Sequence, residues 1–155
     1  MSTMALNLNA CPSGDEKVVL FGLLLETNAR LAKEFGTELE AKCDLPLAWF
    51  DVLLQLRRNE FGRLKMNQIA EAIVHSTGGT TRLIDRLEVA GYVKRENCAN
   101  DRRAIYVAIT PAGNAKLDEA LVVHLAFLDN SLATRLSEPE RTTLSDLLNK
   151  LIAVA

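Results

Sequence analysis

Two short stretches of the sequence contain arginines that could bind a phosphate backbone or the edges of bases. In the first, Arg82 and Arg86 are four residues apart, so they share one face if this stretch is helical. In the second, Arg102 and Arg103 are adjacent within a polar run. A guanidinium group can donate two parallel hydrogen bonds to a guanine edge or to a phosphate. The alternative is that these arginines lie on solvated surfaces, with Arg86 paired to an acidic neighbour at 85 or 88.

The residues before Arg82 are small and polar, as expected at the start of a helix that approaches a partner. Ser76 is a natural N-cap, because its hydroxyl can accept a hydrogen bond from an otherwise unpaired amide. Gly78 and Gly79 each weaken a helix by about 1 kcal/mol relative to alanine. Close approach of the backbone to DNA would explain that cost, and a frayed first turn explains it equally well. The candidate contact residues of this stretch are Ser76, Thr77, Gly78, Gly79, Thr81, Arg82 and Arg86.

The second stretch is predicted to be the turn of a β-hairpin. Residues 92–96 and 104–109 have strand-like patterns, and a polar loop joins them. Arg102 and Arg103 at its tip are suited to a minor groove, whose potential is most negative where the groove is narrow. Asp101 would hold an arginine in position through a charge-assisted hydrogen bond. A solvated loop without a ligand is the alternative.

The distribution of charge favours a polyanionic partner for the middle of the chain. The formal net charge is −2. Residues 57–110 contain ten basic and six acidic side chains, whereas the remainder contains eight basic and fourteen acidic ones. A phosphate backbone would therefore be attracted to the middle and repelled by the flanks.

Hydrophobic periodicity predicts helices on both sides of these stretches. Apolar residues recur at three- and four-residue steps. Gly91 is expected just after one helix, Thr110 is expected to cap the next with Pro111 in its first turn, and Ser137 is expected to open the last helix through a capping box. A loose arm is expected over 1–14 and a loop over 59–65. Helices are expected over 15–42, 46–58, 67–74, 77–90 and 111–135, and from 137 onward.

The predicted fold is mainly α with a small β-hairpin wing, a winged helix-turn-helix joined to a helical dimerisation region. The second of two short helices would enter a major groove about 12 Å wide, while the first helix braces it. Residues 46–110 would form the DNA-binding domain, and residues 15–45 and 111–155 the dimerisation region. The terminal helices contain long stripes of Leu, Ile and Val that one subunit is too short to bury, so a two-fold homodimer is expected.

Several short runs resemble the MarR family of bacterial regulators, and together they span most of residues 15–153. The more specific ones are Leu-x-x-x-Gly-Tyr-Val at 87–93 and Asp-Arg-Arg at 101–103; the others lie at 69–71, 81–88, 91–95 and 109–113. The resemblance implies a homodimeric repressor that binds a pseudo-palindromic site in double-stranded DNA. By position, residues 76–86 match the recognition helix, Arg103 matches the wing arginine that enters the minor groove, and Asp101 matches its orienting partner.

The same resemblance implies a small-molecule effector, in many members an aromatic or phenolic acid that releases the DNA. Trp49, Phe50, Leu53 and His124 supply apolar material where such a ligand would bind, but packing in the core is the simpler interpretation. The identity of the effector and of its pocket stays open.

Two alternatives to a ligand-released regulator remain. A thiol-based redox-sensing regulator could use Cys11, Cys43 or Cys98, and the arginines near Cys98 in the sequence would favour its thiolate. A winged-helix protein–protein adaptor would have the same fold without DNA binding, and would not need the arginines of the two stretches.

Other functional classes are not supported by the residue types present. His75 and His124 are far apart in the sequence, and no glycine-rich phosphate loop, nucleophile elbow or cluster of metal ligands is found. Neither enzymatic activity nor a cofactor or metal is therefore expected. No apolar run approaches the roughly 18 residues of a membrane span, and the start lacks a secretory pattern, so a cytoplasmic location is expected.

Overall fold

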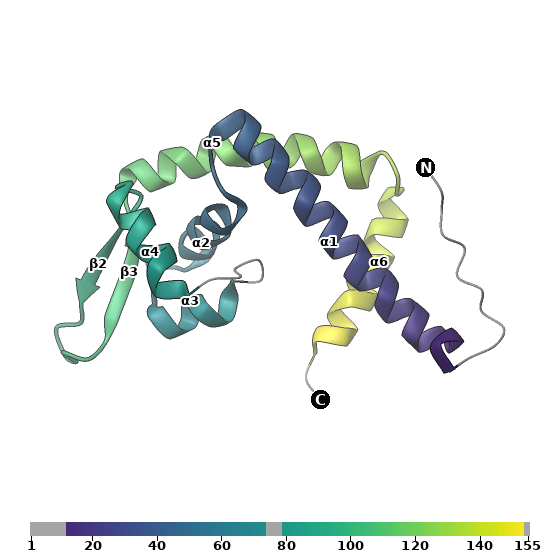
Figure 1. Ribbon diagram of the computed structural model, residues 1–155, viewed down its shortest axis with the longest axis horizontal. Helices are drawn as coiled ribbons and strands as arrows, with labels where there is room; N and C mark the ends of the chain where they lie inside the picture. Colours follow the sequence, from purple (N-terminus) through teal and green to yellow (C-terminus); the bar gives the residue numbers. More distant parts are fainter. Residues whose placement is uncertain (1–11, 74–78, 154–155) are drawn as a thin grey trace. The chain divides into compact units, whose positions relative to one another are not determined.

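The computed structural model of the chain describes residues 12–73 and 79–153 (Figure 1). The chain divides into two compact units, residues 1–34 and 35–155. The first unit contains a short 3₁₀ turn, η1 (Pro12–Gly14), and the beginning of helix α1 (Glu16–Cys43). This turn lies at the end of the expected loose arm over 1–14, and residues 1–11 lie outside the described part.

The second unit contains the rest of α1 and the remaining elements in the expected order. Across the chain, four of the predicted helices, α1 among them, and both strands of the hairpin are confirmed to within about two residues. The elements are α2 (Leu47–Arg58), β1 (Arg63–Lys65), α3 (Met66–Ala72), α4 (Thr80–Val89), β2 (Val93–Asn97), β3 (Ile105–Ile109), α5 (Pro111–Leu128), a π-helical turn η2 (Asp129–Ala133) and α6 (Glu138–Ile152).

The sheet has three antiparallel strands in the order β1-β3-β2 rather than two. Strand β1 pairs with β3 in the register Arg63↔Ala108, and β2 pairs with β3 in the register Val93↔Ile109. The predicted loop over 59–65 is therefore wrong at residues 63–65. A strand of three residues is too short to show alternation in the sequence, and its pairing partner lies far along the chain.

Helix α4 begins later than predicted. Gly79 is the N-cap, with an extended backbone (φ −60°, ψ 129°), and the first helical residue is Thr80 rather than Thr77. The physical reason is the low helix propensity of glycine, which favours a start after the glycine pair. The C-terminal prediction is confirmed, because Gly91 follows the helix with a positive φ of 79°.

The start of α5 packs against the end of α4 through a pair of hydrogen bonds. Thr110 caps α5, since its hydroxyl accepts from the backbone N–H of Gly113 at 3.0 Å. The same hydroxyl donates to the carbonyl of Gly91 at 2.6 Å. The predicted cap at Thr110 and the first-turn proline are thus confirmed, although the α-helix ends at Leu128 and continues as η2.

The predicted cap of the last helix is also present. Ser137 forms a capping box with Glu140, whose carboxylate accepts from the Ser137 backbone N–H at 2.8 Å. The hydrogen bonds from Ser137 to this carboxylate lower the pKa of Glu140.

The core of the second unit surrounds α2. Leu53 and Leu56 of α2 are fully buried, and the fully buried side chains from other elements include Ile69, Ile84, Leu87, Val107 and Leu117. Burial of each such side chain contributes about 1.5–3 kcal/mol relative to exposure. At its C-terminal end, Arg57 of α2 donates from Nε to Asn114 Oδ1 of α5 at 3.0 Å and forms an ion pair with Asp118. The buried side chains of α3, α4 and the sheet thus share one core with α2.

Among the described residues, no helix is long and apolar enough to cross a membrane.

Candidate nucleic-acid interface

Helix α4 has one buried face and one exposed polar face. Ile84 and Leu87 are buried, while Thr81, Arg82 and Arg86 are exposed. Neither arginine side chain forms a hydrogen bond or an ion pair with the described part of the chain. Two fork-shaped donors are therefore available to a ligand on the exposed face of this helix.

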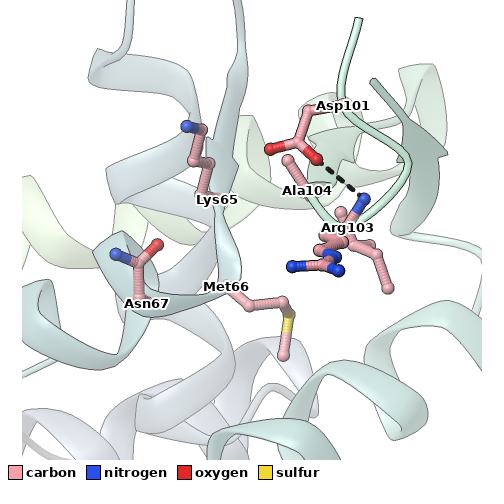
Figure 2. A pocket seen from close by; sticks show the side chains of 7 residues that line it. Lys65, Met66, Asn67, Asp101, Arg103 and Ala104 are labelled. Atoms are coloured by element: carbon pink, nitrogen blue, oxygen red, sulfur yellow. Dashed lines mark hydrogen bonds between the residues drawn. The ribbon is translucent and has the colours of Figure 1, made fainter. Parts of the chain in front are cut away.

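Two main-chain hydrogen bonds stabilise the turn between β2 and β3, and the carbonyl of Asp101 accepts one of them. The backbone N–H of Cys98 donates to Ala104 O at 3.2 Å, and that of Ala104 donates to Asp101 O at 3.1 Å. The carboxylate of Asp101 accepts from the backbone N–H of Arg103 at 3.0 Å (Figure 2). This bond differs from the expected one, because it orders the main chain of the turn rather than the guanidinium group. Arg102 and Arg103 are both exposed.

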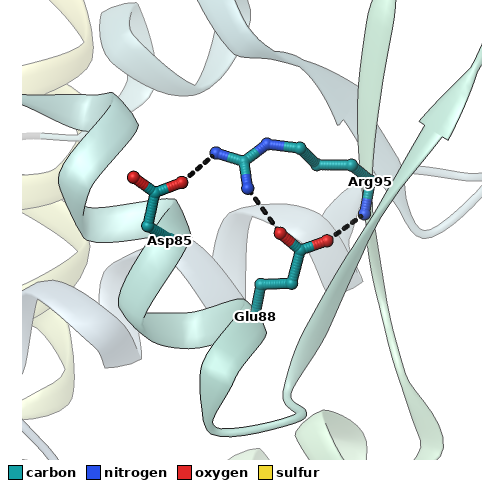
Figure 3. A network of polar contacts seen from close by, with 3 residues as sticks. All are labelled: Asp85, Glu88 and Arg95. Carbon is teal, nitrogen blue, oxygen red and sulfur yellow. Dashed lines mark hydrogen bonds and ion pairs between the residues drawn. The ribbon is translucent and has the colours of Figure 1, made fainter.

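The acidic residues of α4 contact the wing rather than Arg86. Asp85 and Glu88 both pair with Arg95 of β2, at 2.6 Å and 2.5 Å (Figure 3). The suggested pairing of Arg86 with these carboxylates is therefore wrong. Partial burial opposes a charge on Arg95, but the hydrogen bonds to Asp85 and Glu88 outweigh it and raise the pKa of this group.

The opposite face of the sheet contains a second group of charges. Glu96 pairs with Lys94 at 3.0 Å and with Arg63 at 3.4 Å. The hydrogen bond from Lys94 is the largest cause of the lowered pKa of Glu96. Tyr106 lies between two cations, with Arg63 4.9 Å and Lys65 5.8 Å from the ring centroid. The acidic residue on this face is thus neutralised by its neighbours.

A shallow cavity of about 370 Å³ separates the start of α3 from the wing turn (Figure 2). Its lining combines two cations, a carboxylate and an amide with apolar side chains, namely Lys65, Met66, Asn67, Asp101, Arg103, Ala104 and Ile105. Lys65 and Asn67 are exposed candidates that the sequence reasoning missed. The sequence carries no signal for Lys65, because strand β1, which places it opposite Tyr106 of the hairpin, is too short to be predicted.

The aromatic residues considered for an effector pack against one another. The His124 ring lies 4.4 Å from the Phe35 ring and 5.1 Å from the Phe50 ring, and Trp49 packs edge-on against Tyr92. Nδ1 of His124 is buried without a hydrogen-bond partner in the described part of the chain. Burial, with a smaller effect of the Arg58 charge, lowers the pKa of His124. These contacts agree with packing in the core, the simpler of the two interpretations.

The cysteines within the described ranges differ in exposure. Cys43 is buried, and this burial raises the pKa of its thiol. A raised pKa disfavours the reactive thiolate, so Cys43 is poorly suited to sensing an oxidant. Cys98 is half-buried at the end of the wing strand, and Cys11 lies outside the described residues.

Comparison with known proteins identifies the family. The MarR family model matches residues 44–104, from the end of α1 through the wing turn. An HTH-type transcriptional regulator of Bacillus cereus is 33% identical over 119 residues, which are 77% of this chain and 78% of that protein. The chain belongs to the MarR family. The family resemblance stated from the sequence motifs is confirmed, as is the prediction that the chain is a regulator and not an enzyme.

Solved structures of transcriptional regulators have the same fold. BldR from Sulfolobus solfataricus is 28% identical, with a TM-score of 0.77 over 89% of this chain and 95% of that one. Sco3205, a MarR family regulator from Streptomyces coelicolor solved in complex with DNA, has a TM-score of 0.77 over 89% of this chain and 87% of that one. Its identity is 20%, so it supports the fold alone. The predicted fold class, mainly α with a winged helix-turn-helix, is confirmed.

The candidate contact residues fall into two groups in this MarR-family chain. Thr81, Arg82 and Arg86 lie on α4, Gly79 caps this helix, and Arg102 and Arg103 lie on the wing. Both elements belong to the second compact unit and are joined through Arg95. Ser76, Thr77 and Gly78 lie outside the described residues.

Proposed function

We propose that this MarR-family regulator represses transcription as a homodimer, with α4 in the major groove of a pseudo-palindromic operator and the wing in the adjacent minor groove. The observation that carries the proposal is the set of exposed arginines on two linked elements. Arg82 and Arg86 of α4 and Arg102 and Arg103 of the wing have no ion-pair partner within residues 12–73 and 79–153. The other arginines of these elements and of the sheet, Arg63 and Arg95, are paired.

The chemistry of each arginine suggests its role. Arg82 lies in the first turn of α4, where a side chain can reach a guanine edge with two hydrogen bonds. Arg103 stands on a turn ordered by Asp101, and the narrow minor groove attracts such a cation. Asp101 supports this role through the backbone, because its carboxylate is occupied by the amide of Arg103.

Homodimer formation is supported by apolar side chains that remain exposed on the terminal helices. They lie on α1, α5 and α6, and are Val18, Leu20, Phe21, Leu23, Leu25, Val122, Leu125, Leu144, Leu147, Leu148, Leu151 and Ile152. So many exposed apolar residues on consecutive helical turns are typical of a protein interface. A two-fold dimer would place two α4 helices about one DNA turn, roughly 34 Å, apart.

Selection from a pool of random duplexes at two salt concentrations tests this function. We expect enrichment of an inverted repeat whose half-sites are about one turn apart, with weaker binding at the higher salt. Arg103→Gln should weaken binding to the selected operator, whereas Arg135→Gln, which removes an exposed arginine outside α4 and the wing, should not. Failure to enrich any sequence would favour a protein–protein adaptor, and equal binding of the two variants to a selected operator would contradict the role of Arg103.

Release by a small aromatic or phenolic ligand remains a prediction from the family resemblance, as does a cytoplasmic location. The selected operator provides the assay for release, because a panel of aromatic acids can be added to the preformed complex. An acid that lowers operator affinity without unfolding the protein would support ligand release.

A further inference from the structure

Strand β2 carries an arginine on the face of the sheet that points toward α4. The alternation along the strand places Val93 and Arg95 on one face and Lys94 and Glu96 on the other. Val93 is buried and Arg95 is 26% exposed, whereas the side chain of Lys94 is 61% exposed. Arg95 therefore lies between the wing and the helix instead of projecting from the surface as Lys94 does.

Both carboxylates on the adjoining flank of α4 bind this guanidinium group (Figure 3). Nη2 of Arg95 donates to Asp85 Oδ1 at 2.6 Å, and Nη1 donates to Glu88 Oε2 at 2.5 Å. The other oxygen of Glu88 accepts from the backbone N–H of Arg95 at 3.1 Å. The carboxylate of Glu88 thus binds both the main chain and the side chain of Arg95. These two hydrogen bonds limit both sliding and rotation of β2 along α4.

The same flank adjoins the exposed arginines of α4. At 3.6 residues per turn, Asp85 and Glu88 lie between the buried stripe of Ile84 and the exposed position of Arg82. Nη1 and Nη2 of Arg95 each donate to one of these carboxylates, and their two negative charges offset the charge of the guanidinium. Arg95 is therefore less suited to a phosphate contact than the exposed Arg103 is.

We infer that Arg95 is a positioning residue for DNA binding, which fixes the wing to α4 through Asp85 and Glu88 so that the two elements meet adjacent grooves at a set spacing, without itself contacting DNA. The inference rests on the proposed function. A wing that moved independently of α4 would lose more conformational entropy when it bound DNA. The contact of Arg95 with Asp85 and Glu88, here called the clamp, fixes the wing before DNA binds and so reduces that loss.

The test compares two glutamine substitutions on one strand, measured on the operator selected with the wild-type protein. Arg95→Gln removes the clamp, and Lys94→Gln removes the same charge from the next residue on the opposite face. We expect Arg95→Gln to lower affinity on the order of tenfold, the change produced by losing a charge-assisted hydrogen bond. The dependence of affinity on salt should stay unchanged, and the β2 amides should exchange hydrogen faster in the DNA-free protein. Wild-type affinity for Arg95→Gln, or a salt slope lowered by about one as for a phosphate contact, would overturn the inference.

Two further variants distinguish a positioning role of Arg95 from simple cancellation of negative charge and from a general effect on folding. The triple variant Asp85→Asn, Glu88→Gln, Arg95→Gln also removes the two carboxylates that Arg95→Gln leaves unpaired. Its affinity for the operator should stay low if Arg95 acts by positioning the wing. Full recovery would show that Arg95 only cancels negative charge. Glu88→Arg with Arg95→Glu restores a pair of opposite sign, so it should bind better than Arg95→Glu alone, and no recovery would contradict the clamp. If the wild-type protein itself selects no operator, the proposed function fails rather than this inference.

Discussion

Arginines of one small region have different environments, and these environments predict different roles. Arg103 is exposed on the wing turn, whereas Arg95 of the same hairpin is held by two carboxylates. Arg82 lies on α4 without a partner in the described part of the chain. An electrostatic contact in the minor groove, a positioning contact and a base contact in the major groove can be distinguished by their dependence on salt and on DNA sequence.

Substitutions at Arg82 and Arg103 should therefore differ in kind. Arg103→Gln is expected to weaken binding to every operator variant that is altered only in the bases facing α4, because the minor groove attracts this cation through its negative potential, and to lower the salt slope by about one. Arg82→Gln is expected to cost about 1–3 kcal/mol and to relax preference at one position of each half-site. Titration of both variants against the operator and single-base mutants of it provides the measurement. An equal loss on every sequence for Arg82→Gln would assign that residue to the backbone instead.

His124 should make the stability of the protein depend on pH in a defined direction. Burial, followed by the nearby charge of Arg58, lowers the pKa of His124 below its ordinary value of 6.5. The unfolded chain therefore binds a proton at a pH where the folded chain does not, so folding loses stability as pH falls from 6.5 toward the folded pKa. Well above pH 6.5, where His124 is neutral in both states, this residue contributes no pH dependence.

Urea unfolding at pH 7.5 and at pH 5.5 checks this prediction. The loss of stability between the two pH values should be smaller in His124→Phe than in the wild-type protein. The difference between the two proteins isolates His124, because the carboxylates titrate alike in both. An identical loss would show that His124 accepts a proton in the folded state as easily as in the unfolded chain.

At the scale of elements, the junction of α4, the wing and α5 depends on a close backbone approach at Gly113. A Cβ at this position would lie 2.1 Å from the carbonyl oxygen of Tyr92 and 3.0 Å from a side-chain carbon of Ile109. The first turn of α5 thus packs directly on the backbone at the base of the wing, next to the Thr110 cap. The sequence motif Thr-Pro-Ala-Gly combines the cap with the residue that permits this approach.

Gly113→Ala is accordingly expected to destabilise the protein. Overpacking against the fixed backbone of Tyr92 should cost about 1–3 kcal/mol, more than the roughly 1 kcal/mol that alanine adds to a helix. Gly36→Ala is the matched control, because its Cβ would meet Leu47 at an ordinary 3.6 Å, and it should leave stability unchanged or raise it. Thermal unfolding of both variants decides between these outcomes. A Gly113→Ala protein as stable as the control would mean that the junction relaxes.

At the scale of the whole molecule, the exposed apolar residues of the terminal helices predict the oligomeric state. Leu151→Glu should place a charge among apolar neighbours of α6 and weaken a homodimer of the 17.1-kDa chain. Light scattering should then report a mass closer to that of one chain, together with weaker operator binding. Phe61→Ser removes an apolar side chain that is 74% exposed outside the terminal helices, and should leave the mass unchanged. A wild-type protein of single-chain mass would refute the dimer directly.

The amino-acid sequence determined those features that depend on neighbouring residues. Helix periodicity, the Thr110 and Ser137 caps, the turn after α4 at Gly91 and the two hairpin strands follow from local propensities, so they could be predicted together with the family. The exposed arginines at 82, 86, 102 and 103 could be named for the same reason, since an amphipathic helix and a hairpin tip define their outward faces.

Tertiary structure alone decided the features that join distant segments. Strand β1 exists because it pairs with β3, the wing is held to α4 because Arg95 reaches Asp85 and Glu88, and Gly113 is required because Tyr92 lies against it. In the sequence, Arg95 is near Cys98, and Asp85 and Glu88 are near Arg86. In the structure these two carboxylates contact Arg95 instead. Spacing along a chain specifies which side chains share a face, but the partner across that face depends on how the elements pack.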